Sequence, residues 1–318
     1  MWTCADYCAY ACTHEITNHA EARIREHGRD SARIEQFYGK WAFWRLGGIQ
    51  EPASVVFSLL NLWAHVRGLE SLQRELPKRH PMRQMYIYWS LANVNLWIWS
   101  AVFHTRDTPI TEKLDYFSAT LSILYSLFIT VVRLLHLYTP ITLTGHQSEI
   151  LTSSSRLSTR RYFWLWASLC TLLYVGHVSY LSFSPQFDYG YNVLANVILG
   201  FIHNALWLLF SIPHSPFRRF PFPPGPSAPL TQTDPKHTAG PLQRKIGTGA
   251  RREWSPAPAY IGLFTTLATA LEIFDFPPWR RIFDAHSLWH LATVPIVVLW
   301  YRFLVHDSRD DGWIAQKA

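Results

Sequence analysis

Long apolar segments alternate with short polar ones along most of this 318-residue chain. A helix that spans a membrane needs about 20 predominantly apolar residues. Seven segments reach or approach this length, the first and the sixth being the shortest; they lie at about 53–67, 84–104, 114–137, 161–183, 190–212, 258–276 and 286–305. The pattern predicts an all-α membrane protein built as a bundle of seven transmembrane helices.

Two stretches outside these segments differ from them in composition. Residues 1–51 are mixed and polar, and the run EARIREHGRDSARIEQFYG at 21–39 favours a short amphipathic helix. Residues 213–257 are rich in proline and then polar and basic, a composition that cannot bury a core. We therefore expect an N-terminal segment, a membrane domain at 52–306 that contains a disordered loop at 213–257, and a tail at 307–318.

Composition agrees with a membrane protein. Charged residues make up 16% of the chain, against about 25% in an ordinary soluble domain, and aromatic residues make up 15%. The formal net charge of +7 could indicate a nucleic-acid-binding protein. No basic helix or basic face with interleaved aromatic residues supports that class, so we exclude it.

Lysine and arginine are distributed unevenly among the connections. The loops after the first, third and fifth apolar segments carry fourteen of them, and the loops after the second, fourth and sixth carry four. Cytosolic loops are the ones enriched in Lys and Arg. The N-terminus is therefore predicted in the lumen or outside the cell, and the C-terminus in the cytosol.

Three of the four cysteines, Cys4, Cys8 and Cys12, lie close to the N-terminus, and Cys170 lies inside an apolar segment. Their spacing lacks the paired CxxC of a structural zinc site. Lumenal disulfides are the expected use, but three is an odd number, so the pairing stays open and a partner must come from elsewhere. The opening MWTCADYC lacks the regions of a signal peptide, which leaves targeting to the first apolar segment or to residues ahead of Met1.

Polar residues with catalytic chemistry lie at the ends of three apolar segments. Ser100 and His104 are four residues apart and share one helix face at the end of the second segment. Asp115 opens the third segment, and His286 and His290 form a second pair at the start of the seventh. The predicted topology places all five at the same lumenal depth, although none of them contributed to the charge count that defined it.

These residue types suit a metal-assisted hydrolase. Three imidazoles hold Zn²⁺ and leave a fourth position for water, which the metal activates. Asp115 would accept the proton of that water, and Ser100 would hydrogen-bond the water, Asp115 or the developing oxyanion. The alternative is that His286 and His290 are interfacial residues in an aromatic belt beside Trp289.

Four further residues have two interpretations each. Arg106 could meet a lipid phosphate or extend to the headgroups as any surface arginine does. Asp188 and Tyr189 could line the mouth of the site or belong to a turn, and Asp284 could orient His286 or cap a helix. Interhelical hydrogen bonds are the expected role of the polar residues deeper in the fourth and fifth segments, namely His177, Asn196, His203 and Asn204.

Several runs of residues are similar to a known family. They include WTCADYCAYAC at 2–12, WSAVFHTRDTPITEKLDYFSA at 99–119, FDYGYNVLANV at 187–197 and LEIFDFPPWRRIFDAHSLWH at 271–290. Together these runs extend over nearly the whole chain. The sequence resembles the post-GPI-attachment phospholipase family, within the CREST superfamily of seven-helix hydrolases.

The resemblance implies an enzyme that removes the sn-2 acyl chain from GPI-anchored proteins in the endoplasmic reticulum membrane, or in the Golgi membrane as an alternative. It implies that His104, His286 and His290 bind zinc and that Ser100 and Asp115 serve the attacking water. The chain departs from the family in lacking a signal peptide and further cysteines ahead of WTC, and in its long Pro-rich loop. A ceramidase-like amidase and a non-catalytic seven-helix receptor or scaffold remain as alternatives.

Overall fold

The structure is a computed structural model that describes residues 2–138, 141–142, 153–212, 215, 217, 255–309 and 314–315. Helices account for most of them: α1 (Cys4–His27), α2 (Pro52–Glu75), α3 (Arg83–Thr105), α4 (Pro109–Leu134), α5 (Ser153–Phe183), α6 (Tyr189–Ser211), α7 (Ala257–Ile273) and α8 (Ala285–Ser308). A 3₁₀ turn, η1 (Arg29–Ser31), follows α1, and the short strands β1 (Ile141–Thr142) and β2 (Ile314–Ala315) pair in parallel. The predicted all-α class is confirmed. The disorder predicted for 213–257 falls almost entirely outside the described residues.

Each of the seven apolar segments corresponds to one helix from α2 to α8. Among the described residues, α4, α6 and α8 are long and apolar enough to cross a membrane, whereas α7 is apolar but has 17 residues. Helix α3 has a lower hydropathy because it carries three tryptophans, two tyrosines and two asparagines. Length and hydropathy therefore support several membrane helices without establishing the count of seven.

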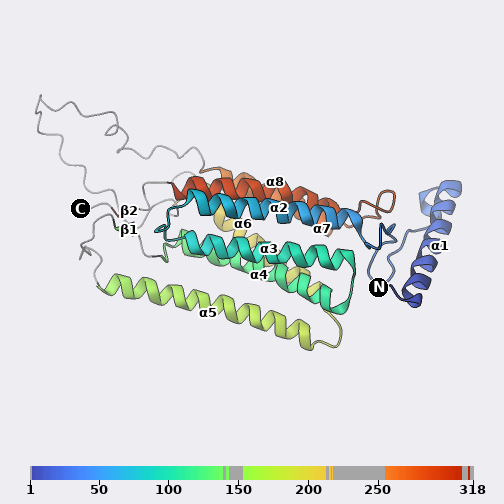
Figure 1. The fold of residues 1–318 in the computed structure, drawn as a ribbon, viewed down its shortest axis with the longest axis horizontal. Helices are drawn as coiled ribbons and strands as arrows, with labels where there is room; N and C mark the ends of the chain where they lie inside the picture. The colour runs from blue at the N-terminus through green and yellow to red at the C-terminus, as the bar shows by residue number, and fades with distance from the viewer. Residues whose placement is uncertain are drawn as a thin grey trace, which may run out of the picture.

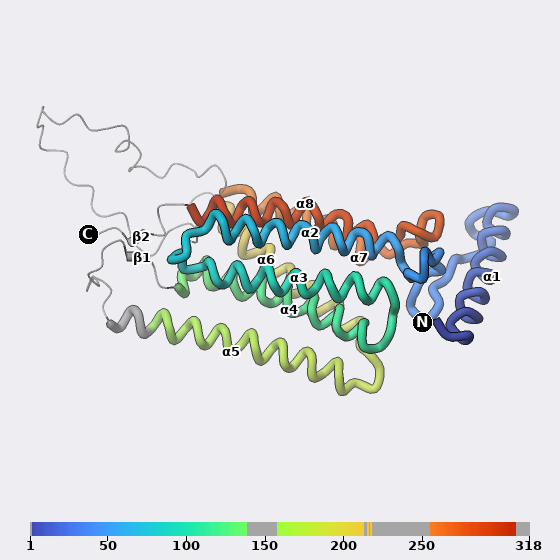
Figure 2. Tube along the Cα trace, viewed as in Figure 1, coloured from blue at the N-terminus to red at the C-terminus, as the bar shows by residue number. Residues whose placement is uncertain are grey.

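Six helices form a closed ring in which each packs against the next: α2, α3, α4, α6, α7, α8 and α2 again. Helix α5 packs against α4 from outside this ring (Figure 1). The tube in Figure 2 shows that α2 and α8, far apart in the sequence, run side by side. As a result, the ends of α2, α3, α4, α7 and α8 can supply side chains to one site within the bundle.

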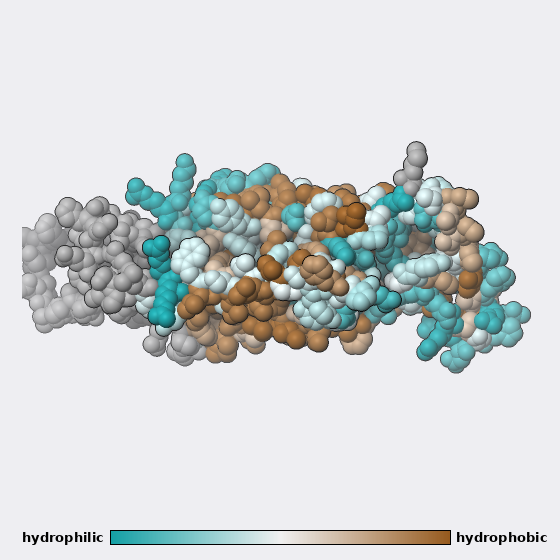
Figure 3. All heavy atoms as spheres, turned by 90° about the horizontal axis from the view of Figure 1, so that it is seen from below, coloured by the Kyte–Doolittle hydropathy of each residue, from teal (hydrophilic) through white to brown (hydrophobic). Residues whose placement is uncertain are grey.

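Much of the outer surface of the bundle is apolar. Large apolar side chains are exposed on its outer helices, for example Leu172 on α5, Leu194 on α6 and Leu267 on α7. Figure 3 shows such side chains gathered along the middle of the bundle, with polar side chains toward its two ends. Soluble monomers rarely expose apolar area on this scale. The chain is therefore a multi-pass membrane protein.

Polar residues inside the bundle join neighbouring helices, as the sequence predicted for some of them. His177 Nε2 on α5 lies 3.1 Å from Thr120 Oγ1 on α4, and Asn204 Nδ2 on α6 donates to Thr266 Oγ1 on α7 at 3.2 Å. Asn196 instead bonds within its own helix. The first two bonds join α5 to α4 and α6 to α7, which is the interhelical role expected of polar residues in a membrane bundle.

The short amphipathic helix predicted at 21–39 is wrong in its position, because α1 begins at Cys4 and ends at His27. Thr3 and Asp6 form a capping box that starts the helix. Gly28 ends it with a φ of 89°, a conformation that glycine adopts at no steric cost. Helix α1 lies across one end of the bundle (Figure 1), where Arg281 binds its Asn18 and Glu21.

The three N-terminal cysteines lie on α1, and all of them are exposed free thiols. Cys170 is a free thiol buried on α5. No disulfide joins two of the described cysteines, so the lumenal disulfides stay a prediction that requires a partner cysteine from elsewhere.

Candidate metal centre

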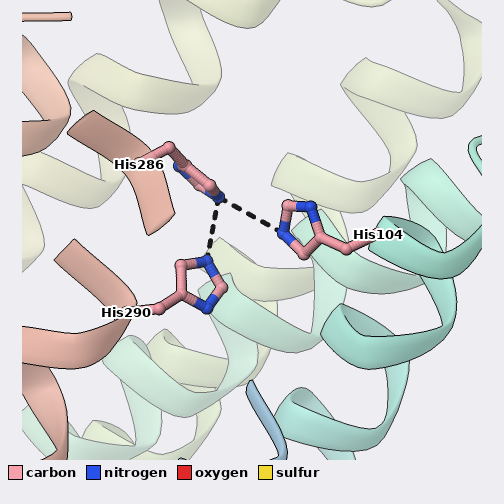
Figure 4. A group of neighbouring side chains, drawn as sticks. All are labelled: His104, His286 and His290. Carbon is pink, nitrogen blue, oxygen red and sulfur yellow. Dashed lines mark hydrogen bonds between the residues drawn. The ribbon is translucent and has the colours of Figure 1, made fainter. Parts of the chain in front are cut away.

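Three histidines meet at the end of the ring that faces α1. His104 is the second-to-last residue of α3, and His286 and His290 lie in the first two turns of α8 (Figure 4). The Nε2 atom of His286 lies 3.3 Å from Nε2 of His104 and 2.9 Å from Nε2 of His290. The sequence predicted that these residues share a depth, and the structure brings their rings into contact.

Each histidine is held at its other nitrogen. Nδ1 of His104 lies 2.7 Å from Glu51 Oε2, and Nδ1 of His286 lies 2.6 Å from Glu272 Oε2. Nδ1 of His290 lies 3.1 Å from Ser58 Oγ. When Nδ1 donates to such a partner, Nε2 keeps its lone pair and becomes a metal ligand. Three lone pairs facing one another repel, so the arrangement favours a cation between them.

The residues present fit a metal ion. Three imidazole nitrogens are the donor set of an open zinc site. Two nitrogens bound to one tetrahedral Zn²⁺ lie about 3.3 Å apart, close to the Nε2 spacings in this cluster. In the described part of the chain, His104, His286 and His290 form a group of three possible ligands whose donor atoms all lie within 4.8 Å of one another. The cluster could therefore hold a metal ion, whose identity the geometry leaves open.

Glu51 connects the cluster to a buried ion-pair network. Lys40 Nζ pairs with Glu51 and, at 3.3 Å, with Asp107 Oδ2, and it lies over the ring of Phe103. Burial raises the pKa of Glu51, but the nearby Lys40 and His104 lower it by more than burial raises it. Its pKa therefore lies well below the usual range. Burial likewise opposes the charge of Lys40, yet Glu51 and Asp107 raise its pKa overall. Both side chains are therefore charged at neutral pH.

Asp115 and Ser100 occupy different places near the histidines. Asp115 lies in the second turn of α4, one turn later than the sequence predicted, and is within electrostatic reach of His286 and Glu272. It makes no hydrogen bond with the described residues, which leaves its carboxylate available. Ser100 is buried and lies 3.0 Å from Ser58 Oγ, so it acts on His290 through Ser58.

The four additional candidate residues have structural partners. Asp284 forms a capping box at the start of α8, and Asp188 caps α6. Tyr189 donates its hydroxyl hydrogen to Glu112, and Arg106 binds Asp6 of α1 at 3.4 Å. The capping interpretation of Asp284 is confirmed, and Asp188 likewise serves as a helix cap.

Sequence reasoning missed Glu51, Ser58 and Glu272. Glu272 is a carboxylate inside an apolar segment, where a charge is costly, and this is a usable signal. Glu51 directly precedes the proline that opens α2, which marks it only as a residue of a helix start. Ser58 has no signal, because a serine in an apolar helix is common.

The chain is thus a helical, multi-pass membrane protein. Its three-histidine cluster, at one end of the bundle, is a candidate metal centre. Comparison with known sequences narrows the class. The Per1-like family matches residues 1–308, and the chain belongs to this family. No solved structure matches it.

Relatives match almost the whole chain. The Protein PER1 homolog of Schizosaccharomyces pombe is 38% identical over 310 residues, which are 98% of this chain and 76% of the relative. Mouse GPI-specific phospholipase A2-like PGAP3 is 34% identical over 307 residues, 96% of this chain and 77% of the relative. The human protein of that name is 32% identical over the same length and covers the same shares.

Replacing Glu272 with glutamine is expected to weaken Zn²⁺ binding by about 10- to 100-fold, because the amide holds Nδ1 of His286 less firmly than the carboxylate does. Glu272 is the better choice for this substitution than Glu51, because the loss of Glu51 would remove an ion-pair partner of the buried Lys40 and disturb the fold. Competition with a chelating dye measures the affinity. The matched control is Glu15→Gln, an exposed glutamate of α1 that pairs with His19. Equal affinity in wild type and Glu272→Gln would contradict the assigned role.

Proposed function

We propose that this protein is a zinc-dependent lipid-ester hydrolase that removes the sn-2 acyl chain from GPI-anchored proteins. The observation that carries the proposal is the convergence of three Nε2 atoms, each on a ring anchored at Nδ1. The names of the relatives, GPI-specific phospholipase A2-like proteins, supply the substrate class. GPI-anchored proteins are then its partners.

We further infer seven membrane spans, α2 to α8, with the N-terminus and the histidines in the lumen of the endoplasmic reticulum. The excess of Lys and Arg in the loops after the first, third and fifth spans supports this orientation. In this topology, residues 1–51 form the lumenal segment and 307–318 the cytosolic tail. A site at the lumenal headgroup level suits an ester near the surface of a lipid.

His104, His286 and His290 would hold the metal. A bound Zn²⁺ supplies Lewis acidity, which activates water and polarises the ester carbonyl. Asp115, whose carboxylate has no hydrogen-bond partner among the described residues, accepts a proton from the attacking water. It then returns this proton to the leaving oxygen as the ester C–O bond breaks. The products are a fatty acid and a lysolipid that remains attached to the protein.

Ser58 and Ser100 position the third histidine in this reaction. The Ser58 hydroxyl accepts the hydrogen bond of His290 Nδ1, and Ser58 in turn bonds Ser100. These two hydrogen bonds keep Nε2 of His290 directed at the centre of the cluster.

The test is release of a labelled sn-2 fatty acid from a GPI-anchored protein by the purified enzyme in lipid nanodiscs. Wild type is expected to cleave this ester and to leave a ceramide amide intact. Asp115→Asn is expected to lower kcat by about 10²- to 10⁴-fold while the metal content stays unchanged.

Glu112→Gln is the matched control, because Glu112 lies one turn before Asp115 and bonds Tyr189. Cleavage of ceramide but not of the ester would replace the proposal with an amidase. If metal-loaded protein cleaves neither lipid, the enzyme is ruled out and a non-catalytic receptor or scaffold is the remaining interpretation.

A further inference from the structure

A groove runs between α2 and α8 at the end of the bundle away from the histidines. Its cavity volume is about 490 Å³, and its lining includes Gly68, Tyr301, Arg302 and Arg309. A Cβ at Gly68 would lie 2.2 Å from a ring carbon of Tyr301, so the two helices approach each other as closely as glycine permits. The close contact forms the floor of what we call the α2–α8 groove.

The groove extends along α8 from the middle of the helix, at Val298, to the end away from the candidate metal centre, at Arg309. Arg302 follows His290 by 12 residues and Arg309 follows it by 19, or about 18 and 28 Å along the helix. The hydrocarbon core of a bilayer is about 30 Å thick. Long arginine side chains at this depth extend to the headgroups. The Arg309 end of the groove therefore reaches the boundary opposite to the proposed active site, and the side chain of Arg302 extends toward it.

Positive charge exceeds negative charge around the groove. Arg67 pairs with Glu70 at 2.7 Å, and Arg309 shares Glu75 with Arg74, the Arg74 Nε–Glu75 Oε1 distance being 3.2 Å. These pairs join three arginines to two glutamates. The exposed Arg302 adds a fourth cation.

Arg302 makes no hydrogen bond or ion pair with any residue that the structure describes. A guanidinium with free N–H groups is suited to bind phosphate oxygens in pairs.

The walls of the groove are apolar. Val298 and Val305 of α8 line it on one side, and Trp63 of α2 lies on the other with 59% of its surface exposed. Trp63 is the twelfth of the 24 residues of α2, so its large apolar ring lies at the depth of the acyl chains. A ligand that matches the groove thus carries both a negative head and a hydrocarbon tail.

We propose that the α2–α8 groove binds an anionic phospholipid. Arg302 and Arg309 contact the headgroup phosphate, and the upper part of an acyl chain lies against Trp63 and Val298. Basic pockets between transmembrane helices are suited to acidic lipid headgroups, and each arginine near the surface contributes to the attraction. The groove is separate from the histidine cluster, so this lipid is a bound partner and not the substrate of the proposed reaction.

The test is native mass spectrometry of the purified full chain, mixed with phosphatidylserine or with phosphatidylcholine. We expect phosphatidylserine adducts on wild type and about fivefold weaker binding by Arg302→Gln, since one surface arginine is lost. Arg161→Gln is the matched control, because Arg161 is an exposed arginine of α5, a helix that packs on α4 and does not border the groove. It is expected to bind as wild type does.

Three outcomes would overturn the inference: equal binding of phosphatidylserine and phosphatidylcholine, undiminished binding by an Arg302→Gln/Arg309→Gln double variant, or competition by millimolar inorganic phosphate, which would indicate a phosphate site without lipid selectivity. The readout needs no hydrolysis, so it stands whether or not the proposed function holds. Loss of ester cleavage with lipid binding intact would separate the two proposals.

Discussion

Replacing His290 with alanine is expected to remove the metal from the protein and to lower ester hydrolysis by about three orders of magnitude or more. His290 is 2% exposed, and its Nε2 lies 2.9 Å from Nε2 of His286. A Lewis acid contributes several kcal/mol to a hydrolytic transition state, and each 1.36 kcal/mol changes the rate tenfold. Inductively coupled plasma mass spectrometry should find about one zinc ion per wild-type chain and almost none in the variant.

A control histidine distinguishes a metal ligand from a residue that merely packs. His177 is buried on α5 and bonds Thr120 outside the cluster, so His177→Ala removes a buried imidazole without touching the site. This variant is expected to keep its zinc. Properly folded wild type that binds no metal, or His290→Ala that retains it, would refute the hydrolase mechanism.

Replacing Asp307 with leucine is expected to lower the free energy of unfolding by about 3–5 kcal/mol, because it leaves the buried guanidinium of Arg133 without its counter-ion. Arg133 Nε and Nη2 donate to the two carboxylate oxygens of Asp307 at 2.7 and 2.8 Å. Both side chains are almost completely buried, at 1% and 3% exposure. The pair joins α4 to α8 at the end away from the histidines.

The double variant Arg133→Met/Asp307→Leu should recover most of that loss, since it leaves no unpaired charge. The stability of each variant is measured by heating the detergent-purified protein and determining, by size-exclusion chromatography, the fraction that stays folded at each temperature. Glu70→Ala, which breaks the exposed pair with Arg67, is the control and should cost about 0–1 kcal/mol. A double variant that is less stable than Asp307→Leu would show that the pair contributes more than charge compensation.

The apolar pattern was sufficient to place the seven helices α2 to α8. It failed for α1, which contains no long apolar run. Helix α1 has a mixed surface, so periodicity gave its position incorrectly. The local signals were nevertheless present: Thr3 and Asp6 have capping-box spacing, and Gly28 follows the last turn. Capping chemistry would have been a better guide than amphipathicity in this segment.

The site was predictable where its residues come in pairs along a helix. His286 and His290 are four residues apart, and a topology based on charge placed His104 at the same depth. The partners of the three rings were not predictable in this way. Glu51, Ser58 and Glu272 come from α7 and from the start of α2, and only the closure of the helix ring brings them to the histidines.

Exposure is uneven among the three histidines, and this asymmetry bears on how a lipid arrives. His104 is 2% exposed, whereas the His286 side chain is 32% exposed beside Glu272 of α7. Helix α1 lies beyond this end of the bundle (Figure 1), and the outer face of α7 carries exposed Leu263 and Leu267. A substrate that approaches past α7 comes by lateral diffusion within the bilayer. Its effective concentration is then its number per unit area of membrane, so neutral lipid dilutes it as water dilutes the substrate of a soluble enzyme.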